Sequence, residues 1–201
     1  MPCAIPFTVP AGSLSSGAQP SIASRDGSLV LRPWRAGDAP VLVRAFQDPG
    51  IGRWHMRQVA TPEEARRWIT DSAGHWEAER AAQWAITRGD DVDGEVLGRM
   101  SLRWMDLLHG AAECAYWVLP EARGTGVATR ALRALAGWAL DDIGFRRLEL
   151  AHSVHNEASC RVAVKSGFVQ EGVRRSAMVH ADGRHDMHLH ARIPTDPCPA
   201  P

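Results

Sequence analysis

The feature that most constrains the fold is a glycine-rich run at residues 123–128, with the sequence Arg-Gly-Thr-Gly-Val-Ala. It lies between a strand-like segment, residues 113–119, and a long segment whose apolar residues recur at helical spacing. Two glycines allow the backbone to turn tightly and to approach an anion closely. The helix that follows presents unpaired N–H groups and the positive end of its dipole. The run therefore predicts a pyrophosphate-binding turn between a strand and a helix.

Two common nucleotide-binding motifs do not fit this run. A dinucleotide-binding fingerprint would place Gly or Ala where Thr129 stands, and it would normally open a βαβ unit early in its domain. A P-loop would require Gly-Lys followed by Ser or Thr, and the run lacks that sequence. The pattern that fits is Arg/Gln-x-x-Gly-x-Gly/Ala, filled by Arg123, Gly126 and Ala128.

This pattern resembles the coenzyme A pyrophosphate loop of the GNAT N-acyltransferase superfamily. Residues 155–172 resemble that family's second signature, which is Asn-x-x-Ser, a helix, and then Gly-Phe-x-x-Glu-Gly. Because both motifs occur in the right order and separation, the chain is identified as a member over residues 28–193. Residues 112–118 resemble the branch that acetylates the N-terminal amines of ribosomal proteins, the RimJ/RimL-like acetyltransferases.

The spacing of apolar residues predicts an α/β (α+β) fold with a mixed sheet. A helix follows the glycine run and a short buried strand follows the helix, so the two flanking strands are expected to be parallel, while hairpins elsewhere are antiparallel. About seven strands and about four helices are expected. The family resemblance implies that the parallel pair splays apart and that the pantetheine arm of the coenzyme fills the gap. The expected strands are residues 28–34, 83–88, 95–104, 111–119, 147–152, 169–179 and 186–193.

Composition favours one domain in a soluble, cytoplasmic enzyme. The 201 residues suffice for one core, and 23 basic residues balance 23 acidic ones, so no overall field attracts nucleic acid. Residues 1–27 are rich in Pro, Ser, Gly and Ala and are expected to form a disordered leader, neither signal peptide nor membrane span. Residues 194–201 are expected to be a flexible tail. The four cysteines lack metal-ligand spacing, so no metal is expected.

The resemblance implies transfer of an acyl group from a coenzyme A thioester to an amine. An amine attacks only when neutral, so the site must accept a proton. Glu113 occupies the acidic position before the Tyr-Trp pair of the resembling branch and is the predicted base. Partial desolvation would raise its proton affinity, and Trp117 and Trp104 are candidate walls. The alternative is a strand-edge glutamate in a salt bridge.

Other predicted roles follow from the same resemblance. Ser159 is the candidate donor of a hydrogen bond or proton to the coenzyme sulfur, with a helix-capping serine as the alternative. Asn156 is expected both to cap a helix and to bind the pantetheine arm. Lys165 would either reach the phosphates or remain a solvated helix residue. The predicted coenzyme-binding residues are Trp117, Val118, Leu119, Arg123, Gly124, Thr125, Gly126, Val127, Ala128, Thr129, Asn156 and Ser159.

Two further groups of residues allow competing interpretations. Cys160 lies beside histidines in the sequence, but it points about 100° away from Ser159 on a helix, so a buried filler is favoured over a nucleophile. Histidines 180, 185, 188 and 190 suggest metal, yet the alternation at 187–190 favours a polar sheet face. The candidate acceptor-site residues, which equally suit ordinary packing, are Trp54, His55, Arg57 and Trp104.

The interpretation that follows is an N-acetyltransferase that uses acetyl-CoA as co-substrate and acts by direct attack of a primary amine in a ternary complex. The acceptor stays open among a protein N-terminus, a small amine, an amino acid and an antibiotic. The acyl group is inferred from the family alone, and a homodimer is left open. The alternative is an acyl-CoA-binding module without turnover, against which the presence of Glu113 argues.

Overall fold

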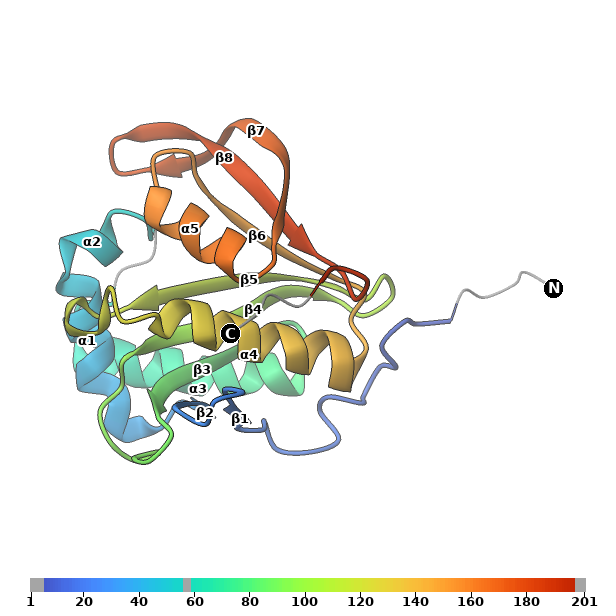
Figure 1. The fold of residues 1–201 in the computed structure, drawn as a ribbon. Helices are drawn as coiled ribbons and strands as arrows, with labels where there is room; N and C mark the ends of the chain where they lie inside the picture. The colour runs from blue at the N-terminus through green and yellow to red at the C-terminus, as the bar shows by residue number, and fades with distance from the viewer. Residues whose placement is uncertain (1–5, 56–58, 198–201) are drawn as a thin grey trace.

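The computed structural model describes residues 6–55 and 59–197, which form one open sheet with helices on both faces (Figure 1). Its eight strands lie in the order β1-β2-β3-β4-β5-β6-β8-β7. The mixed sheet is confirmed, with one strand more than the seven expected, because residues 22–23 pair with the strand predicted first. The strands are β1 (Ile22–Ala23), β2 (Leu29–Pro33), β3 (Ala82–Arg88), β4 (Gly98–Asp106), β5 (Ala111–Val118), β6 (Arg147–Ser153), β7 (Val169–His180) and β8 (Gly183–Arg192).

In the described residues, five α-helices accompany the sheet, together with 3-10 turns at Ala36–Asp38 and Pro120–Ala122 and a π-helical continuation of α4 at Trp138–Ile143. In Figure 1, α4 and α5 lie on the near face of the sheet and α3 lies on the far face. The short α2 is the helix that the sequence patterns miss. The helices are α1 (Ala39–Gln47), α2 (Pro49–Gly52), α3 (Pro62–Glu77), α4 (Val127–Gly137) and α5 (Glu157–Lys165).

The sequence Thr61-Pro62-Glu63-Glu64 predicts a capping box, and this capping box forms the start of α3. Thr61 Oγ1 accepts a hydrogen bond from the Glu64 amide at 3.2 Å, and the Glu64 carboxylate accepts one from the Thr61 amide at 3.3 Å. Pro62 occupies the first helical position, where its missing N–H has no intrahelical partner to lose. Trp68 and Trp76 follow on the buried side of the helix, so the sequence specifies both where α3 begins and which face it buries.

The parallel pair β5 and β6 forms a fork. The two strands pair only near their starts, and Glu113 opposite Glu149 is the last paired position. Beyond it, β6 remains paired with β8 as far as Ser153, while β5 remains paired with β4 as far as Val118. The strands therefore separate toward their carboxyl ends, as expected, and the gap faces the start of α4.

Two apolar clusters fix the fork from opposite faces. One packs beneath α4, where Leu132 and Leu135 are fully buried. The other lies between the sheet and helices α1 and α3, where the Trp34 and Trp68 rings meet edge to face with centroids 5.6 Å apart. Trp117 belongs to this second cluster, so burial of its indole anchors β5 at the fork. Within the described residues, no helix is both long and apolar enough to cross a membrane.

The segment 6–27 differs from the disordered leader expected from its composition, because it packs along the domain. Val9 is fully buried and Leu14 is 5% exposed. The Glu79 carboxylate accepts hydrogen bonds from the amides of Gly12, Leu14 and Ser15 at 2.6, 2.8 and 2.9 Å. A few apolar residues in a Pro- and Ser-rich segment are therefore ordered by a partner that lies far away in the sequence.

Candidate active site

A groove of about 510 Å³ opens at the fork between β5 and β6. Four segments form its walls: the end of β5, the glycine loop with the first turn of α4, one side of α5, and the α2 segment. The residues lining it are Gly50, Ile51, Trp54, His55, Tyr116, Trp117, Val118, Ala122, Arg123, Gly124, Gly126, Val127, Ala128, Thr129, Asn156, Ala158, Ser159, Arg161, Val162 and Lys165.

The glycine loop presents backbone N–H groups to the groove. Gly124 and Gly126 have φ of +76° and +80°, a conformation that side chains other than glycine rarely adopt. Gly126 is the residue that precedes α4, no side chain caps this helix, and the first helical bond runs from the Arg130 amide to the Gly126 carbonyl at 3.0 Å. The amide groups of the first turn are therefore available to an anion.

The charged residues lining the groove are cationic. Arg123 links the loop to α2, because its guanidinium pairs with the Asp48 carboxylate and its Nε donates to the Val118 carbonyl at 3.2 Å. Arg161 and Lys165 lie along the α5 wall. Arg161 was not singled out from the sequence, since its position four residues after Glu157 suggests only a surface ion pair. Together these side chains favour an anionic ligand.

All but two of the predicted coenzyme-binding residues line the groove. Leu119 is instead buried in the core, with 1% of its surface exposed. Thr125 turns back into the loop, and its hydroxyl donates to the Ala122 carbonyl at 2.8 Å. Asn156 caps α5 by accepting a hydrogen bond from the Ser159 amide at 3.1 Å, which is the structural half of its predicted role.

A hydroxyl pair lies in the groove between β5 and α5. The Tyr116 hydroxyl and Ser159 Oγ are 2.8 Å apart, so one donates a hydrogen bond to the other. Burial raises the pKa of Tyr116 to about 12, with the Ser159 hydrogen bond opposing that rise, so the phenol stays protonated near neutral pH. Tyr116 is the single tyrosine of the chain. Tyr116 and Ser159 are 43 residues apart in the sequence, so no local motif predicts their contact.

Glu113 lies at the fork and is 6% exposed. Arg103 on β4 donates to its carboxylate through Nε at 2.8 Å and also through Nη2. Burial nevertheless raises the pKa of Glu113 above its usual value, Arg103 opposes that rise, and the neighbouring Glu149 adds to it. The ion pair of the alternative interpretation is thus present, together with the desolvation that a base requires. Glu113 is not among the residues that line the groove.

The two tryptophans considered as walls for Glu113 lie in different environments. Trp117 is 4% exposed and packs against Trp34, with ring centroids 6.2 Å apart. Trp104 is 65% exposed, has a φ of +50° and lies at a bulge of β4, where its ring packs against the Arg103 guanidinium at 4.4 Å. Trp104 therefore covers the ion pair from the solvent side and is not brought together with the other candidate acceptor residues.

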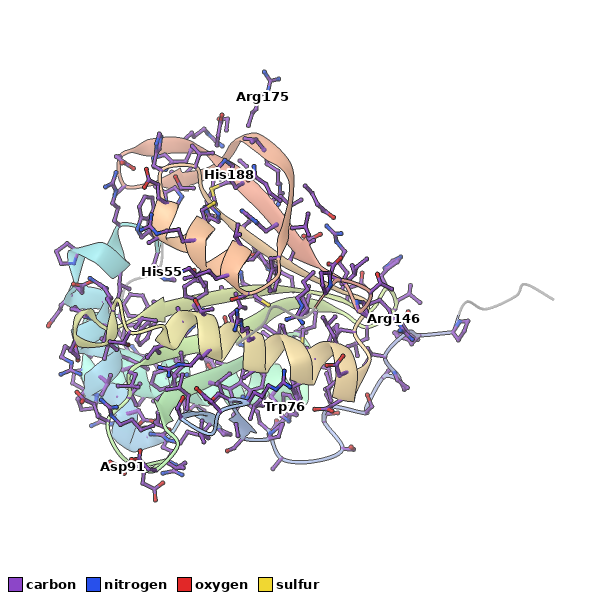
Figure 2. All side chains as sticks on the ribbon, viewed as in Figure 1. His55, Trp76, Asp91, Arg146, Arg175 and His188 are labelled. Atoms are coloured by element: carbon purple, nitrogen blue, oxygen red, sulfur yellow. The ribbon has the colours of Figure 1, made fainter. Side chains whose placement is uncertain are left out.

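The remaining candidate acceptor residues lie at the far end of the groove. Trp54 and His55 line it, whereas Arg57 lies outside the described residues. The Trp54 ring packs against His180 at 5.6 Å, and Arg53 pairs with Asp182 at 3.1 Å, so the β7–β8 hairpin meets the α2 segment here. In Figure 2, His55 lies between α5 and the end of β5.

A buried cation accompanies these residues. Arg99 on β4 is 8% exposed, and its Nη2 donates to Ser101 Oγ at 2.9 Å. Its Nε is buried without a hydrogen-bond partner in the described ranges, and no carboxylate of those ranges pairs with it. Burial lowers the pKa of Arg99 to about 9, with Arg103 adding to that effect, so its charge persists at neutral pH. Burial, together with these two cations, lowers the pKa of His55 to about 3.

Comparison with known proteins points to one family. The family model of the acetyltransferase (GNAT) domain matches residues 28–169. The uncharacterized N-acetyltransferase YoaA of Bacillus subtilis (strain 168) is 26% identical over 166 residues, which are 82% of this chain and 93% of that protein. The ribosomal-protein-serine acetyltransferase of Escherichia coli (strain K12) is 28% identical over 135 residues, which are 67% of this chain and 73% of that protein.

Solved structures agree with this result. RimL, a ribosomal-protein alpha-N-acetyltransferase solved in complex with coenzyme A, superimposes with a TM-score of 0.78 at 23% identity, over 87% of this chain and 98% of that one. A likeness at this identity shows a shared fold. Since the family model matches more than half of the sequence, the chain belongs to the GNAT acetyltransferase family.

Proposed function

We propose that the protein transfers an acetyl group from acetyl-CoA to a primary amine by direct attack in a ternary complex. The observation that carries the proposal is the forked groove, which has free amides and cationic side chains at its mouth and the Tyr116–Ser159 pair inside. Among solved structures that share the fold, RimL was solved with coenzyme A, and the microcin C7 self-immunity enzyme MccE was solved with acetyl-CoA and AMP. The balanced charge supports an acceptor other than nucleic acid, and the proposal retains a cytoplasmic location.

In the proposed reaction, the amine nitrogen attacks the thioester carbon, the N–C bond forms and the C–S bond breaks. The proton that the amine loses passes to Glu113, through a water molecule because the carboxylate lies behind the groove lining. Coenzyme A leaves as a thiolate. Its sulfur accepts a hydrogen bond from Ser159, whose hydroxyl is oriented by Tyr116. The products are the acetylated amine and free coenzyme A.

The hydroxyl pair is better suited to stabilise the thiolate than to protonate it. A thiol has a pKa of about 8.5, whereas the pKa of Tyr116 is about 12. A full proton transfer from the phenol would therefore be uphill by several kcal/mol, since each pKa unit corresponds to about 1.4 kcal/mol. Hydrogen bonds that strengthen as charge develops on the sulfur avoid that penalty. The proton that completes the thiol comes from solvent.

Replacing Tyr116 with phenylalanine tests this arrangement. The ring stays and the hydroxyl is lost, so we expect kcat to fall about 5- to 10-fold, the effect of one hydrogen bond of about 1–1.4 kcal/mol. Ser159→Ala should reduce kcat at least as much. Because both hydroxyls act through one contact to sulfur, the double variant should be no slower than Ser159→Ala. Additive losses in thiol-release assays would contradict the coupled pair.

Arg99 is buried behind the groove and is not among the residues that line it, and its unpaired charge supports an acceptor that carries an anionic group near its amine. A carboxylate or phosphate placed against the guanidinium would satisfy the buried Nε donor and neutralise a charge that has no counterion in the described ranges. His55 is neutral at physiological pH and supplies no competing cation. Amino acids, aminoalkyl phosphates and acidic peptide N-termini all offer this combination.

The experiment that tests the function is thiol release from acetyl-CoA with a library of amines in matched pairs, each acid beside its neutral amide. We expect acceptor-dependent release, with kcat/KM about 10- to 100-fold higher for the acids, which is the value of a hydrogen bond to a charged group. Arg99→Met should remove the preference while leaving the amides unchanged. An equal rate for acid and amide would contradict an anionic acceptor without affecting the assignment of acetyl transfer.

The alternative function is an acyl-CoA-binding module without turnover. Calorimetry that detects coenzyme A binding, combined with no acceptor-dependent thiol release for any amine, would support it. The raised pKa and burial of Glu113 favour the enzyme, since a binding module gains nothing from a desolvated carboxylate at the fork.

A further inference from the structure

Four side chains that the acetyl-transfer site does not use converge on the other side of α5. They are His152 from β6, His188 and His190 from β8, and Cys160 from α5. Their nearest imidazole nitrogens and the Cys160 sulfur all lie within 4.8 Å of one another. His188, labelled in Figure 2, lies where β8 and α5 face each other. None of the four lines the coenzyme groove.

The sheet register explains why these residues meet. His190 lies opposite Leu150 and His188 lies opposite His152 on the neighbouring strand, so the three imidazoles share one face of the sheet. The histidines of the sequence run therefore lie on two different faces of the sheet. His185 faces the opposite side, where its Nδ1 lies 2.8 Å from Ser153 Oγ. The metal set considered from the sequence combined residues of both faces, and it lacked His152 and Cys160.

The hydrogen bonds in the cluster direct a nitrogen lone pair of His152 toward the other members. His152 Nδ1–H donates to the Ser153 carbonyl at 2.8 Å, which places the lone pair of this ring on Nε2. That Nε2 lies 3.1 Å from His190 Nε2, which can donate a hydrogen bond to it, and a bound zinc ion would replace the shared proton. His188 Nδ1 is buried and has no hydrogen-bond partner in the described part of the chain. A backbone carbonyl that orients a ring through its other nitrogen is typical of metal-binding histidines.

We propose that His152, Cys160, His188 and His190 bind a zinc ion in a closed, structural His3Cys site. Three imidazoles and one thiolate are a ligand set that zinc prefers, and four protein ligands leave no open position for catalysis. Tetrahedral zinc–nitrogen and zinc–sulfur bonds place ligand atoms roughly 3.3–3.6 Å apart. The His152 and His190 nitrogens, 3.1 Å apart, lie slightly closer than this range, and the other ligand atoms, at most 4.8 Å apart, need to approach by about 1 Å.

The position of the site assigns it a mechanical role. Cys160 is the only ligand on α5, and it directly follows Ser159, which faces the groove and Tyr116. Zinc would join α5 to β6 and β8 at the wall of the fork, where β6 has no pairing with β5. We therefore expect metal loss to loosen the α5 wall and to weaken coenzyme A binding without removing any coenzyme ligand.

The test uses the full chain without a histidine tag. Elemental analysis should find one zinc ion per chain, and the protein reloaded with cobalt should show the ligand-field bands of a tetrahedral site and a sulfur-to-cobalt charge-transfer band. Cys160→Ser should lose the charge-transfer band. Both Cys160→Ser and His188→Ala should weaken zinc binding by more than about 100-fold, beyond the loss that outer-shell changes cause.

A matched control is His155→Ala, because His155 belongs to the other histidine group, with its ring 5.2 Å from His185, and should leave zinc stoichiometry unchanged. Absence of the cobalt charge-transfer band in the wild-type protein would overturn the proposal even if the variants fail to fold. Equal zinc affinity in wild type, Cys160→Ser and His188→Ala would also overturn it. Neither result depends on acetyl transfer, so the two proposals fail separately.

Discussion

Replacing Glu113 with glutamine is expected to lower kcat for amine acetylation by about 100- to 1000-fold, the usual contribution of a general base. The dissociation constant for coenzyme A should change by less than about twofold, which corresponds to about 0.4 kcal/mol of binding free energy. The amide keeps the shape of the carboxylate and can still face Arg103, but it cannot accept the proton of the attacking amine. Single-turnover thiol release and calorimetric titration with coenzyme A measure the two quantities.

The reason for so large an effect is the environment of the carboxylate. Glu113 is buried at the fork, and burial raises its pKa despite the opposing charge of Arg103. A base must be ionised to act, so activity should fall as the pH drops through this pKa, at a higher pH than for an ordinary glutamate with a pKa of about 4.3. Arg103→Met removes the charge that lowers the pKa, and it should therefore move the acid limb of the kcat/KM profile to still higher pH.

Glu149 offers a matched control. It lies directly opposite Glu113 in the parallel pair, and Arg147 donates to its carboxylate at 2.7 Å. Glu149→Gln removes the same charge from the same fork, yet it should leave kcat within about threefold, since this partly exposed carboxylate is paired with Arg147 and is not the predicted base. Equal losses in the two variants would mean that Glu113 acts through the charge and folding of the fork and not as a base.

The parts of the fold that sequence patterns predicted are those set by local chemistry. The capping box at Thr61, the glycines before α4 and the alternation along the sheet strands each specify a local backbone conformation, and the structure confirms them. The parallel pairing of β5 and β6 followed from the helix between them, since such a crossover makes the strands parallel, whereas their separation was implied by the family resemblance. The place of the glycine loop in the groove could also be predicted, because its residues are contiguous in the sequence.

The remainder depends on contacts between distant residues. Val9 and Leu14 are ordered by burial and by the Glu79 carboxylate, which nothing in the composition of the segment indicates. Tyr116 meets Ser159 only because the fork places α5 against the open edge of β5. Cys160 meets histidines of two strands through the sheet register. Sequence spacing shows the periodicity within one helix or strand. Contacts between distant residues depend instead on which face of the folded sheet packs against each helix.

A second large effect is expected at the glycine loop. Gly126→Val should weaken coenzyme A binding by at least about 100-fold, which corresponds to roughly 2.7 kcal/mol. Gly126 has a φ of +80°, and an added Cβ would meet no protein atom within 4 Å. The substitution thus causes no clash within the protein itself. The branched side chain would instead occupy the space over the first-turn amides of α4, where the pyrophosphate is expected to bind.

Backbone strain alone could also weaken coenzyme A binding in Gly126→Val. The control variant must therefore introduce the same backbone strain at a position outside the loop. Gly144, at the end of the π-helical segment that continues α4, has a φ of +92°, and a Cβ there also meets nothing within 4 Å. Gly144→Val should lower the free energy of unfolding by about 1–3 kcal/mol, as Gly126→Val should, because both force a branched residue into the left-handed region. Thermal unfolding measures that shared effect, and calorimetry measures coenzyme affinity. If the loop binds the pyrophosphate, coenzyme affinity falls in Gly126→Val and is preserved in Gly144→Val. Equal coenzyme affinity in the two variants would contradict the assignment of this loop as the pyrophosphate site.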